Sequence, residues 1–319
     1  YNSATVLETC IEALLRNSKI HPDEIIVVDD ASKDQSVTVA SRPGIKLVTT
    51  VVNVGPGPAR NLGVAHASGN ILVFVDADVA VAPDALSRLA RHFSVTPYCT
   101  AVIGSYDNAP EARNLISQYR NLLHCYVHQN APEQASHFWA GIGAIRKSTF
   151  VAVGGFDETE FGRACEDIEL GYRLRDAGYC IRVDPLVQGK HLKRWSFTSM
   201  MRTDIFVRAI PWTHLLLARR KMPRDFSLGW SQRASVALAW LLPFSLLAAL
   251  IQPYALAAAL LLFGTFIAAN LNFFRFLNVQ RGWTLTLATI PLHWLYHFNS
   301  GMGFSLGVIS FSWPGPVSY

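Results

Sequence analysis

Two carboxylates directly follow an apolar run: Asp76 and Asp78 come after Ile71–Val75 in the stretch ILVFVDAD. The run predicts a strand, and acids at a strand end can be ordinary turn residues. An Asp-Ala-Asp spacing can also bind a divalent cation, because carboxylate oxygens suit hard cations, which in turn bridge phosphate oxygens. The chemistry that these two residues suggest is therefore the handling of a phosphate group through a metal ion.

Two more stretches suit a phosphorylated ligand. In VVDDASKD, Asp29 and Asp30 end another β-branched run. In NVGPGPARNLG, the glycines let the backbone come close to a ligand, and the Arg60 guanidinium can meet a base or a phosphate. Each stretch alone also fits a turn rich in Asp, Ser and Gly.

A further cluster of acids lies in CEDIELGYRLRDAGY, where Glu166, Asp167 and Glu169 occupy the start of an expected helix. Acids in a first helical turn are often partners of the helix dipole and nothing more. A carboxylate can equally serve as a general base. One such cluster would be read as structural, but all of them in this order are hard to assemble by chance.

The elements that must position these residues alternate between short β-branched runs and helical stretches over residues 1–195. This alternation is typical of an α/β domain with a Rossmann-like, mostly parallel sheet. The expected strands are EIIVVDD, IKLVTT, NILVFVDAD and TAVIGSY, and PDALSRLARHF is an expected helix. Ligands of such sheets bind outside the carboxyl ends of the strands. Both Asp29-Asp30 and Asp76-Asp78 lie at such ends.

The ordered motifs resemble those of an inverting family 2 glycosyltransferase of the GT-A fold, with membrane helices appended. The resemblance covers about residues 1–195 and is carried by VVDDAS, GPARNLG, DAD, WAGIGAIRKSTF, GGFDE, CEDIELGYRLRDAGY and HLKRW. The set is far more specific than any of its members.

The resemblance implies a role for each candidate residue. Asp30, beside Asp29, would contact the nucleotide base or ribose, with Asn53 and Arg60 nearby. Asp76 would reach the ribose or the metal, and Asp78 would ligate Mg²⁺ or Mn²⁺ on the diphosphate together with His191. Asp167 would be the general base, with Glu166 shaping its environment. Arg194 and Trp195 would contact diphosphate or acceptor, or alternatively anchor the chain at a membrane surface.

The chemistry agrees with these roles. Breaking the bond between an anomeric carbon and phosphate builds positive charge on the sugar and negative charge on the leaving diphosphate, so it needs a cation on one side and a base on the other. In direct displacement the base lies opposite the leaving group, which predicts inversion. Asp78 and Asp167 should then flank one site.

Two departures from the family pattern stand out. The family opens with an apolar strand before a motif like the YN at the start, so we expect further sequence before Tyr1, in which further membrane spans could lie. In KHLKRW, His191 stands where the QxxRW element of processive polysaccharide synthases has Gln. This difference argues against processive synthesis.

The C-terminal part is almost free of charge: residues 234–319 contain Arg275 and Arg281 but no acid. Two runs near the roughly 20 residues that a bilayer requires, with a third after them, predict two to three transmembrane helices. They are Ala234–Ile251, Pro253–Leu271 and Leu285–Phe311. A buried core helix is the alternative for any single run. Basic residues before the first run place the N-terminal part in the cytoplasm.

These observations predict three segments: a GT-A-like domain over 1–195, an interfacial amphipathic basic segment over 196–233 broken near Pro211, and a membrane domain over 234–319. A core helix of the N-terminal domain is the alternative for the middle segment. The net charge of +5 and the pI of about 9.0 fit a face held against anionic lipid, with no sign of a nucleic-acid partner.

The leading hypothesis is a metal-dependent transferase that moves a sugar from a nucleotide-sugar donor to a lipid-linked or membrane-held glycan acceptor. A processive polysaccharide synthase is the alternative among transferases, and a nucleotidyltransferase is another enzyme class. A catalytically inactive scaffold that binds nucleotide sugar is the alternative outside catalysis. The apparently intact acids Asp30, Asp78 and Asp167 argue against the scaffold.

Overall fold

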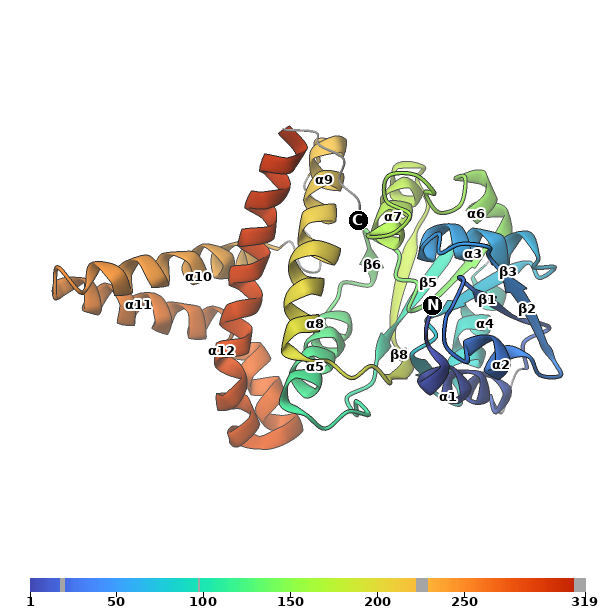
Figure 1. Cartoon of the computed structure of the whole chain (residues 1–319), viewed down its shortest axis with the longest axis horizontal. Coiled ribbons are helices and arrows are strands. Elements are labelled where there is room, and N and C mark those ends of the chain that lie inside the picture. The colour runs from blue at the N-terminus through green and yellow to red at the C-terminus, as the bar shows by residue number, and fades with distance from the viewer. Residues whose placement is uncertain (18–20, 97, 222–228, 313–319) are drawn as a thin grey trace. The chain divides into compact units, whose positions relative to one another are not determined.

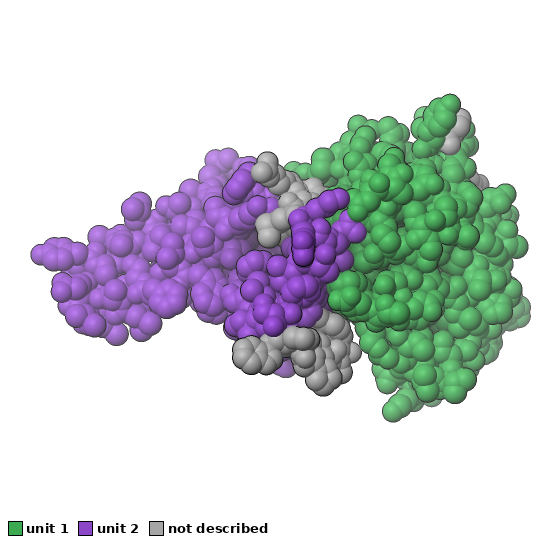
Figure 2. All heavy atoms as spheres, turned by 90° about the horizontal axis from the view of Figure 1, so that it is seen from above, with its two compact units in different colours: residues 1–112, 127–194 green, residues 113–126, 195–319 purple. Residues whose placement is uncertain are grey.

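The computed structural model describes residues 1–17, 21–96, 98–221 and 229–312 (Figure 1). The chain divides into two compact units (Figure 2). Unit 1 comprises Tyr1–Ala112 and Val127–Arg194, and unit 2 comprises Arg113–Tyr126 and Trp195–Tyr319. The division at residue 194 lies next to the sequence-predicted boundary at residue 195, but the segment 113–126 belongs to unit 2.

Unit 1 is an α/β unit, and its strands occur where the β-branched runs predict them. Its helices are α1 (Ala4–Leu15), α2 (Ser36–Ala40), α3 (Pro56–Ala65), α4 (Ala85–Val95), α6 (Lys147–Ala152) and α7 (Glu166–Asp176). Its strands are β1 (Ile25–Asp29), β2 (Ile45–Thr49), β3 (Ile71–Val75), β4 (Val79–Val81), β5 (Ala101–Tyr106), β6 (Gln134–Ala135), β7 (Ile142–Arg146) and β8 (Ile181–His191).

The sheets are mixed, so the expectation of a mostly parallel sheet is wrong. β1 and β2 pair in parallel. The larger sheet has the order β3-β7-β5-β8-β4 with β6 on β8, and only its β5–β8 pair is parallel. The physical reason is where β7 starts. Its first residue, Ile142, pairs with Val75, the last residue of β3, so β7 runs antiparallel beside β3.

The candidate residues nevertheless collect at one edge. β5 and β8 run in parallel with Tyr106 opposite Gly189, so their carboxyl ends meet. Val79, just after the Asp-Ala-Asp stretch, pairs with His191 at the end of β8. The ends of β3, β5 and β8 therefore carry Asp76, Tyr106 and His191 to the same part of the sheet, as the rule for open α/β sheets requires.

Helix α7 carries the second group of acids and is held by a close backbone contact. A Cβ on Gly171 would collide with backbone atoms of His137 and Phe138. Only glycine lets α7 approach that segment, which leads on to β7. Cys165, the residue before α7, has the left-handed φ of 63°, which turns the chain sharply into the first helical turn.

Unit 2 is helical. In addition to α5 (Leu115–Gln129), most of which it contains, its elements are α8 (Phe197–Arg202), the π-helix η1 (Thr203–Ala209), α9 (Ile210–Arg219), α10 (Trp230–Ala248), α11 (Tyr254–Ala269) and α12 (Leu271–Ser312). α12 has a break at Gly282, whose φ is 78°. α10 and α11 form a hairpin in which they lie side by side (Figure 1).

The segment 196–219 is not interrupted near Pro211 as expected. Pro211 is the second residue of α9, and the π-helix η1 leads into α9 without a break in the helical path. The wider π-turn is where the chain adjusts its backbone hydrogen bonds before the proline. Both η1 and α9 pack on α12 within unit 2. This packing differs from the alternative of a core helix in the N-terminal domain.

The expected spans coincide with α10, α11 and the later part of α12. No single described helix is both long and apolar enough to cross a bilayer. Taken together, α11 and α12 are long and apolar enough, but the pair is bent by 64°. The 16 residues of α11 would extend about 24 Å, short of a hydrocarbon core of roughly 30 Å.

The packing of α7 yields a stability prediction. Replacing Gly171 by Ala should destabilise unit 1 by about 1–3 kcal/mol, because the backbone collision outweighs the gain of up to about 1 kcal/mol in helix propensity. Thermal unfolding would measure the change. Gly69→Ala is the matched control, since its nearest atom would be 3.6 Å away. Equal melting temperatures for both variants would show that the contact at Gly171 can relax.

Candidate active site

The Asp-Ala-Asp stretch is held by the backbone on both sides. The Asp76 N–H donates to the carbonyl of Gly141 at 3.2 Å, which ties the end of β3 to the start of β7. The Asp78 carbonyl accepts from the Leu192 N–H at 2.8 Å. The two carboxylates remain accessible, with side chains 35% and 29% exposed. The backbone is thus fixed while the oxygens can still reach a ligand.

Arg60 joins the two groups of acids. Its guanidinium pairs with Asp76 (Nη2 to Oδ1, 2.8 Å) and with Glu166 (Nη1 to Oε1, 2.5 Å). It also lies over the ring of Phe156, 5.4 Å from the centroid. Burial lowers the pKa of Arg60, but the two carboxylates outweigh burial and raise it above its ordinary value. One cation from α3 therefore connects the end of β3 to the first turn of α7.

Asp167, the next residue on α7, has a carboxyl group with a raised pKa. Burial is the main cause, the neighbouring Glu166 charge adds to it, and Arg60 only partly opposes it, so that the pKa of Asp167 rises to about 7. Its Oδ1 accepts the N–H of Ile168 at 2.8 Å, and its Oδ2 accepts the N–H of Ala140 at 3.4 Å. A carboxyl group with a pKa near neutrality is suited to general-base work.

Asp78, in contrast to Asp167, has a lowered pKa. Its Oδ2 lies 3.4 Å from Nε2 of His191. Burial raises the pKa of Asp78, but the hydrogen bond and charge of His191, together with Lys193, bring it below the usual value. The His191 ring is stacked on Tyr106 at 4.3 Å with an interplanar angle of 8°. This stack fixes the orientation of the imidazole beside an ionised carboxylate.

Tyr106 lies beside the acids through its stack on His191, the partner of Asp78. Burial raises the pKa of the Tyr106 hydroxyl well above its ordinary value, and the charges of Asp78, Asp76 and Asp167 raise it further. Tyr106 also meets Trp139 edge to face, with ring centroids 4.9 Å apart.

The residues predicted to contact the nucleotide form a separate, loop-building group. Asp30 is buried, and its carboxylate accepts from the Thr50 hydroxyl (2.9 Å) and from the N–H groups of Val54 (2.8 Å) and Gly55 (2.9 Å). Asn53 donates to the Asp30 carbonyl at 3.2 Å. These bonds shape the loop before α3, from which Arg60 projects.

Two neighbours of that loop complete its anchoring. Asp29 accepts the Ser32 N–H at 3.0 Å, at the start of the turn that follows β1. Arg163 donates to the Asn53 side chain at 3.0 Å, so the loop before α7 is tied to the loop before α3. The nucleotide contacts expected of Asp29, Asp30 and Asn53 stay predictions.

Arg194 and Trp195 stand on the two sides of the division between the units. Arg194 is exposed at the end of unit 1. Trp195 belongs to unit 2, where it is buried. Its backbone N–H donates to the Ser117 hydroxyl at 2.7 Å, and the Arg120 guanidinium lies 5.4 Å from its ring centroid. Their predicted contact with diphosphate or acceptor also stays a prediction.

The side chains present fit a divalent cation whose remaining ligands would be oxygens of the substrate. Within the part of the chain that the structure describes, no three His, Cys, Asp or Glu side chains are grouped as metal ligands. Asp78 and His191 provide an adjacent oxygen and nitrogen, and diphosphate oxygens could supply further ligands, a combination that suits Mn²⁺ or Mg²⁺. One Asp76 oxygen is already engaged with Arg60.

Tyr106 and Trp139 are site residues that the sequence reasoning missed. One signal was present: Tyr106 is the last residue of an expected strand, β5, much as Asp76 directly follows β3. Trp139 opens the motif WAGIGAIRKSTF, but that motif assigned it no role. Its place depends on contacts with Tyr106 and with His128, whose ring centroid lies 4.4 Å away.

The fold of the chain is that of GT-A enzymes. A mannosyltransferase from Pyrobaculum calidifontis, solved with GDP-Man and Mn²⁺, superposes with a TM-score of 0.56 at 20% identity, covering 98% of this chain and 85% of the other. Residues 1–152 match the family Glycosyl transferase family 2, and residues 121–194 match the N-terminal domain of galactosyltransferase. The N-terminal part of the chain is therefore a family 2 glycosyltransferase domain.

Two curated relatives show the range of the family. The poly-beta-1,6-N-acetyl-D-glucosamine synthase of Staphylococcus aureus is 26% identical over 198 residues, which are 58% of this chain and 46% of that protein. The O-antigen chain rhamnosyltransferase RfbN of Salmonella typhimurium is 27% identical over 232 residues, which are 66% of this chain and 71% of that protein. The match with the synthase thus spans about half of its length.

The Arg60 contacts predict a large stability effect. Arg60→Met keeps the apolar stem but leaves the mostly buried Glu166 without its cation, which should cost about 2–4 kcal/mol in the free energy of unfolding. Arg88→Met is the control, because its ion pair with Asp84 is 38% and 41% exposed and should contribute less than about 1 kcal/mol. Chemical denaturation would measure both. A loss no larger for Arg60 than for Arg88 would contradict the bridging role.

Proposed function

We propose that this protein transfers a sugar from a nucleotide-diphosphate sugar to a hydroxyl of a lipid-linked or membrane-held glycan, with inversion and with a divalent cation. The observation that carries the proposal is the pairing of two differently tuned carboxylates in one site: Asp167 with a pKa of about 7, and Asp78 with a lowered pKa beside His191. The GT-A fold and the family 2 domain support the class of reaction.

Asp167 acts as the base in this proposal. Its carboxylate takes the proton of the acceptor hydroxyl as the acceptor oxygen forms a bond to the anomeric carbon and the bond to the diphosphate breaks. Glu166 keeps the site negative and holds Arg60 in place. Because the base acts on the sugar face opposite the leaving group, the product has the inverted configuration.

Asp78 and His191 would hold the cation, and Asp76 is a further candidate ligand. When bound, the cation would neutralise charge on the leaving diphosphate. The stack of His191 on Tyr106 keeps the imidazole in one orientation, which lowers the cost of assembling the ligands. The Mn²⁺ in the structurally similar Pyrobaculum mannosyltransferase supports this assignment.

The donor nucleotide would lie against the loops that follow β1 and β2. Asp29, Asp30 and Asn53 build these loops, and Arg60 follows them on α3. Arg194 and Trp195 would contact diphosphate or acceptor, with a membrane-surface anchor as their alternative role. Binding of base and ribose by this region is the part of the proposal that depends most on the family resemblance.

Unit 2 would anchor the enzyme in a membrane, with the transferase domain in the cytoplasm and residues 196–233 at the interface. Large apolar side chains at the tip of the α10–α11 hairpin are strongly exposed: Leu250 (83%), Ile251 (81%) and Tyr254 (84%). Such a contiguous apolar surface favours contact with lipid. The bent pair α11–α12 supports insertion by length and composition.

A processive polysaccharide synthase is the second candidate, because one curated relative is a poly-beta-1,6-N-acetyl-D-glucosamine synthase. His191 at the position of Gln in the QxxRW element favours single transfer. The length distribution of products made with excess donor would separate the two: one added sugar supports transfer, and long chains support synthesis.

The metal assignment can be tested through nucleotide affinity. Asp78→Asn should abolish the increase in nucleoside-diphosphate affinity that Mn²⁺ produces, because an amide oxygen binds a hard cation more weakly than a carboxylate. Calorimetry with Mn²⁺ and with EDTA would measure it. Asp184→Asn, which alters another Asp–His pair (His92, 2.8 Å), is the matched control. An Mn²⁺-dependent gain that persists in Asp78→Asn would refute the assignment.

The base can be tested separately from donor binding. Asp167→Asn should leave nucleotide-sugar affinity within about twofold while reducing kcat by at least about 10²-fold, since the amide cannot take a proton. Asp176→Asn, at the exposed end of the same helix, should keep full activity. If Asp167→Asn transfers sugar at nearly the wild-type rate, another group is the base.

The pH dependence follows from the raised pKa. The protonated carboxyl of Asp167 cannot accept a proton, so kcat/KM for the acceptor should fall as the pH drops through about 7 and level off above it. Initial rates at constant free Mn²⁺ would give the profile. A flat profile between pH 6 and pH 8 would show that Asp167 does not limit the reaction in this way.

A further inference from the structure

The tryptophans of the chain are unevenly divided between the two units. Of eight tryptophans, seven occur from Trp195 onward, and only Trp139 belongs to unit 1. Its neighbour Phe138 is fully buried and meets Phe74 edge to face, with ring centroids 6.0 Å apart. Trp139 itself is half-buried. Phe138 therefore holds this segment in the core of unit 1, while part of Trp139 stays accessible to a ligand.

The backbone that follows Trp139 is bonded to both groups of acids. The Ala140 N–H donates to Oδ2 of Asp167 at 3.4 Å. The Gly141 carbonyl accepts the N–H of Asp76 at 3.2 Å. The two residues directly after Trp139 thus contact the proposed base and the first acid of the Asp-Ala-Asp stretch, and the same bonds that fix these acids also fix the start of the tryptophan side chain.

The indole ring is held in one orientation by its neighbours. It meets the Tyr106 ring at 4.9 Å with an interplanar angle of 89°, and the His128 ring at 4.4 Å with an angle of 84°. A Cβ on Gly141 would collide with three indole atoms, among them Nε1, so glycine is what leaves room for the ring there. A ligand that binds the indole therefore does not have to order it first, which lowers the cost of binding.

Tyr106 links the indole to the other side of the site. Its ring is stacked on His191, whose Nε2 lies 3.4 Å from Oδ2 of Asp78. Trp139 is thus linked through Ala140 to the base and through Tyr106 to the proposed cation ligands. In the proposed reaction, the base receives the proton of the acceptor hydroxyl and the cation binds the diphosphate, so the reacting sugars lie between these two groups.

The chemistry of an indole matches that of a sugar ring. A pyranose has a face of C–H groups and a rim of hydroxyls, and an indole has an apolar, electron-rich face and one N–H donor. Among the residues that the structure describes, the Trp139 indole N–H has no hydrogen-bond partner. A phosphate would use only this donor, and a hydrocarbon chain would use only the ring. A sugar uses both.

We infer that Trp139 forms a subsite for the pyranose ring that carries the attacking hydroxyl of the acceptor. The indole packs against the C–H face of this ring, and its N–H donates to a hydroxyl oxygen on the rim. The acceptor is the preferred sugar because Ala140, the next residue, contacts the base that receives the acceptor proton. The inference rests on the proposed function for the presence of a glycan acceptor, and it adds the residue that recognises it.

The test measures sugar binding at Trp139 without measuring transfer. The full-length protein is labelled with 5-fluorotryptophan and kept in octaethylene glycol dodecyl ether, a detergent without a sugar, with Mn²⁺ and either UDP or GDP. The probes are the octyl glycosides of glucose, galactose, mannose and rhamnose, and 1-octanol is their counterpart without a sugar. Fluorine NMR follows each indole, and the signal that is missing from Trp139→Phe belongs to Trp139. At least one glycoside should shift this signal saturably, and octanol should not.

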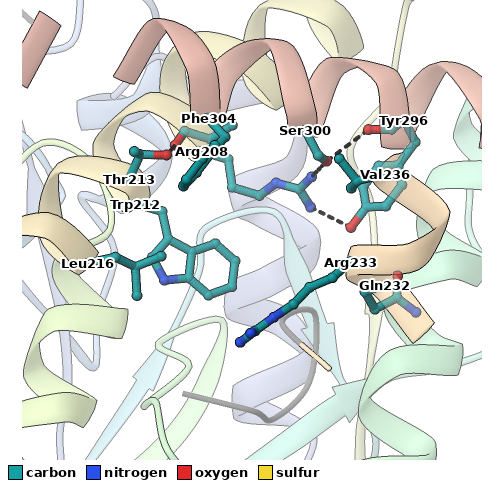
Figure 3. A pocket seen from close by; sticks show the side chains of 11 residues that line it. Arg208, Trp212, Thr213, Leu216, Gln232, Arg233, Val236, Tyr296, Ser300 and Phe304 are labelled. Carbon is teal, nitrogen blue, oxygen red and sulfur yellow. Dashed lines mark hydrogen bonds between the residues drawn. The ribbon is translucent and has the colours of Figure 1, made fainter. Parts of the chain in front are cut away.

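Trp212 is the internal reference for binding of the octyl chain. It lines a mostly apolar pocket of about 310 Å³ in unit 2, formed by residues of η1, α9, α10 and α12 (Figure 3). An octyl chain in this pocket would shift the Trp212 signal with the glycosides and with octanol alike. The comparison of the two indoles therefore separates recognition of a sugar from burial of a hydrocarbon chain.

One variant and one matched control locate the contact. Trp139→Phe keeps an aromatic ring against Tyr106 and His128 but removes the N–H, so calorimetry should show glycoside affinity reduced on the order of tenfold. Nucleoside-diphosphate affinity should be unchanged, and an unchanged melting temperature would show that the variant is folded. Tyr98→Leu removes an aromatic side chain of unit 1 that is 90% exposed, and should bind the glycoside like wild type.

Three results would overturn the inference. If none of the glycosides shifts the Trp139 signal, the indole does not bind a sugar. If UDP or GDP alone produces the shift, the indole contacts the nucleobase. If a nucleotide sugar produces it without a glycoside, the indole contacts the transferred sugar and not the acceptor. Failure of the proposed function has a different signature: a Trp139 signal that responds to a glycoside in a protein that binds no nucleoside diphosphate would support the subsite and contradict the transferase.

Discussion

The Arg60 guanidinium bridges two carboxylates that are far apart in the chain, and the rest of the candidate site depends on this bridge. Asp76 ends β3, whereas Glu166 begins α7, 106 residues beyond Arg60. Without a cation between them, the buried Glu166 and the partly exposed Asp76 would repel each other, and the first turn of α7 would lose a contact that holds it in place. The loops that precede α3, built around Asp30, matter because they deliver Arg60 to this position.

The same bridge explains how one site can hold carboxylates with opposite tasks. Burial and the neighbouring Glu166 charge raise the pKa of Asp167 to about 7, and Arg60, which is paired with Asp76 and Glu166, offsets only part of this rise. Burial raises the pKa of Asp78, but the hydrogen bond to His191 and the nearby Lys193 outweigh it, so the pKa falls below its usual value. Environments that push two carboxyl pKa values apart are a general way to create a base and a charged ligand side by side. This electrostatic division is the physical basis of the proposed transfer reaction.

The sequence predicted the positions of strands and acidic clusters well, but it did not predict how strands pair or which side chains meet. The strands ending at Asp29, Asp76 and Tyr106 follow from β-branched runs bounded by turn residues, and the acids at the start of α7 were visible as a group. Strand direction was not predictable, because β5 is buried along its whole length and its pattern is the same for parallel and antiparallel neighbours. The Arg60 bridge, the stack of Tyr106 on His191 and the π-helix before Pro211 all depend on tertiary contacts that no local pattern encodes.

Arg60 lowers the proton affinity of Asp167, the proposed base, and the pH profile of kcat/KM for Arg60→Gln compared with wild type tests this effect most directly. Loss of the guanidinium removes a charge that lowers the pKa of Asp167 while Asp76 and Glu166 remain. The account predicts that the acidic limb moves to higher pH in the variant, with part of the lost activity recovered in alkaline buffer. An acidic limb at the same pH in both proteins, with only a uniform loss of rate, would contradict it.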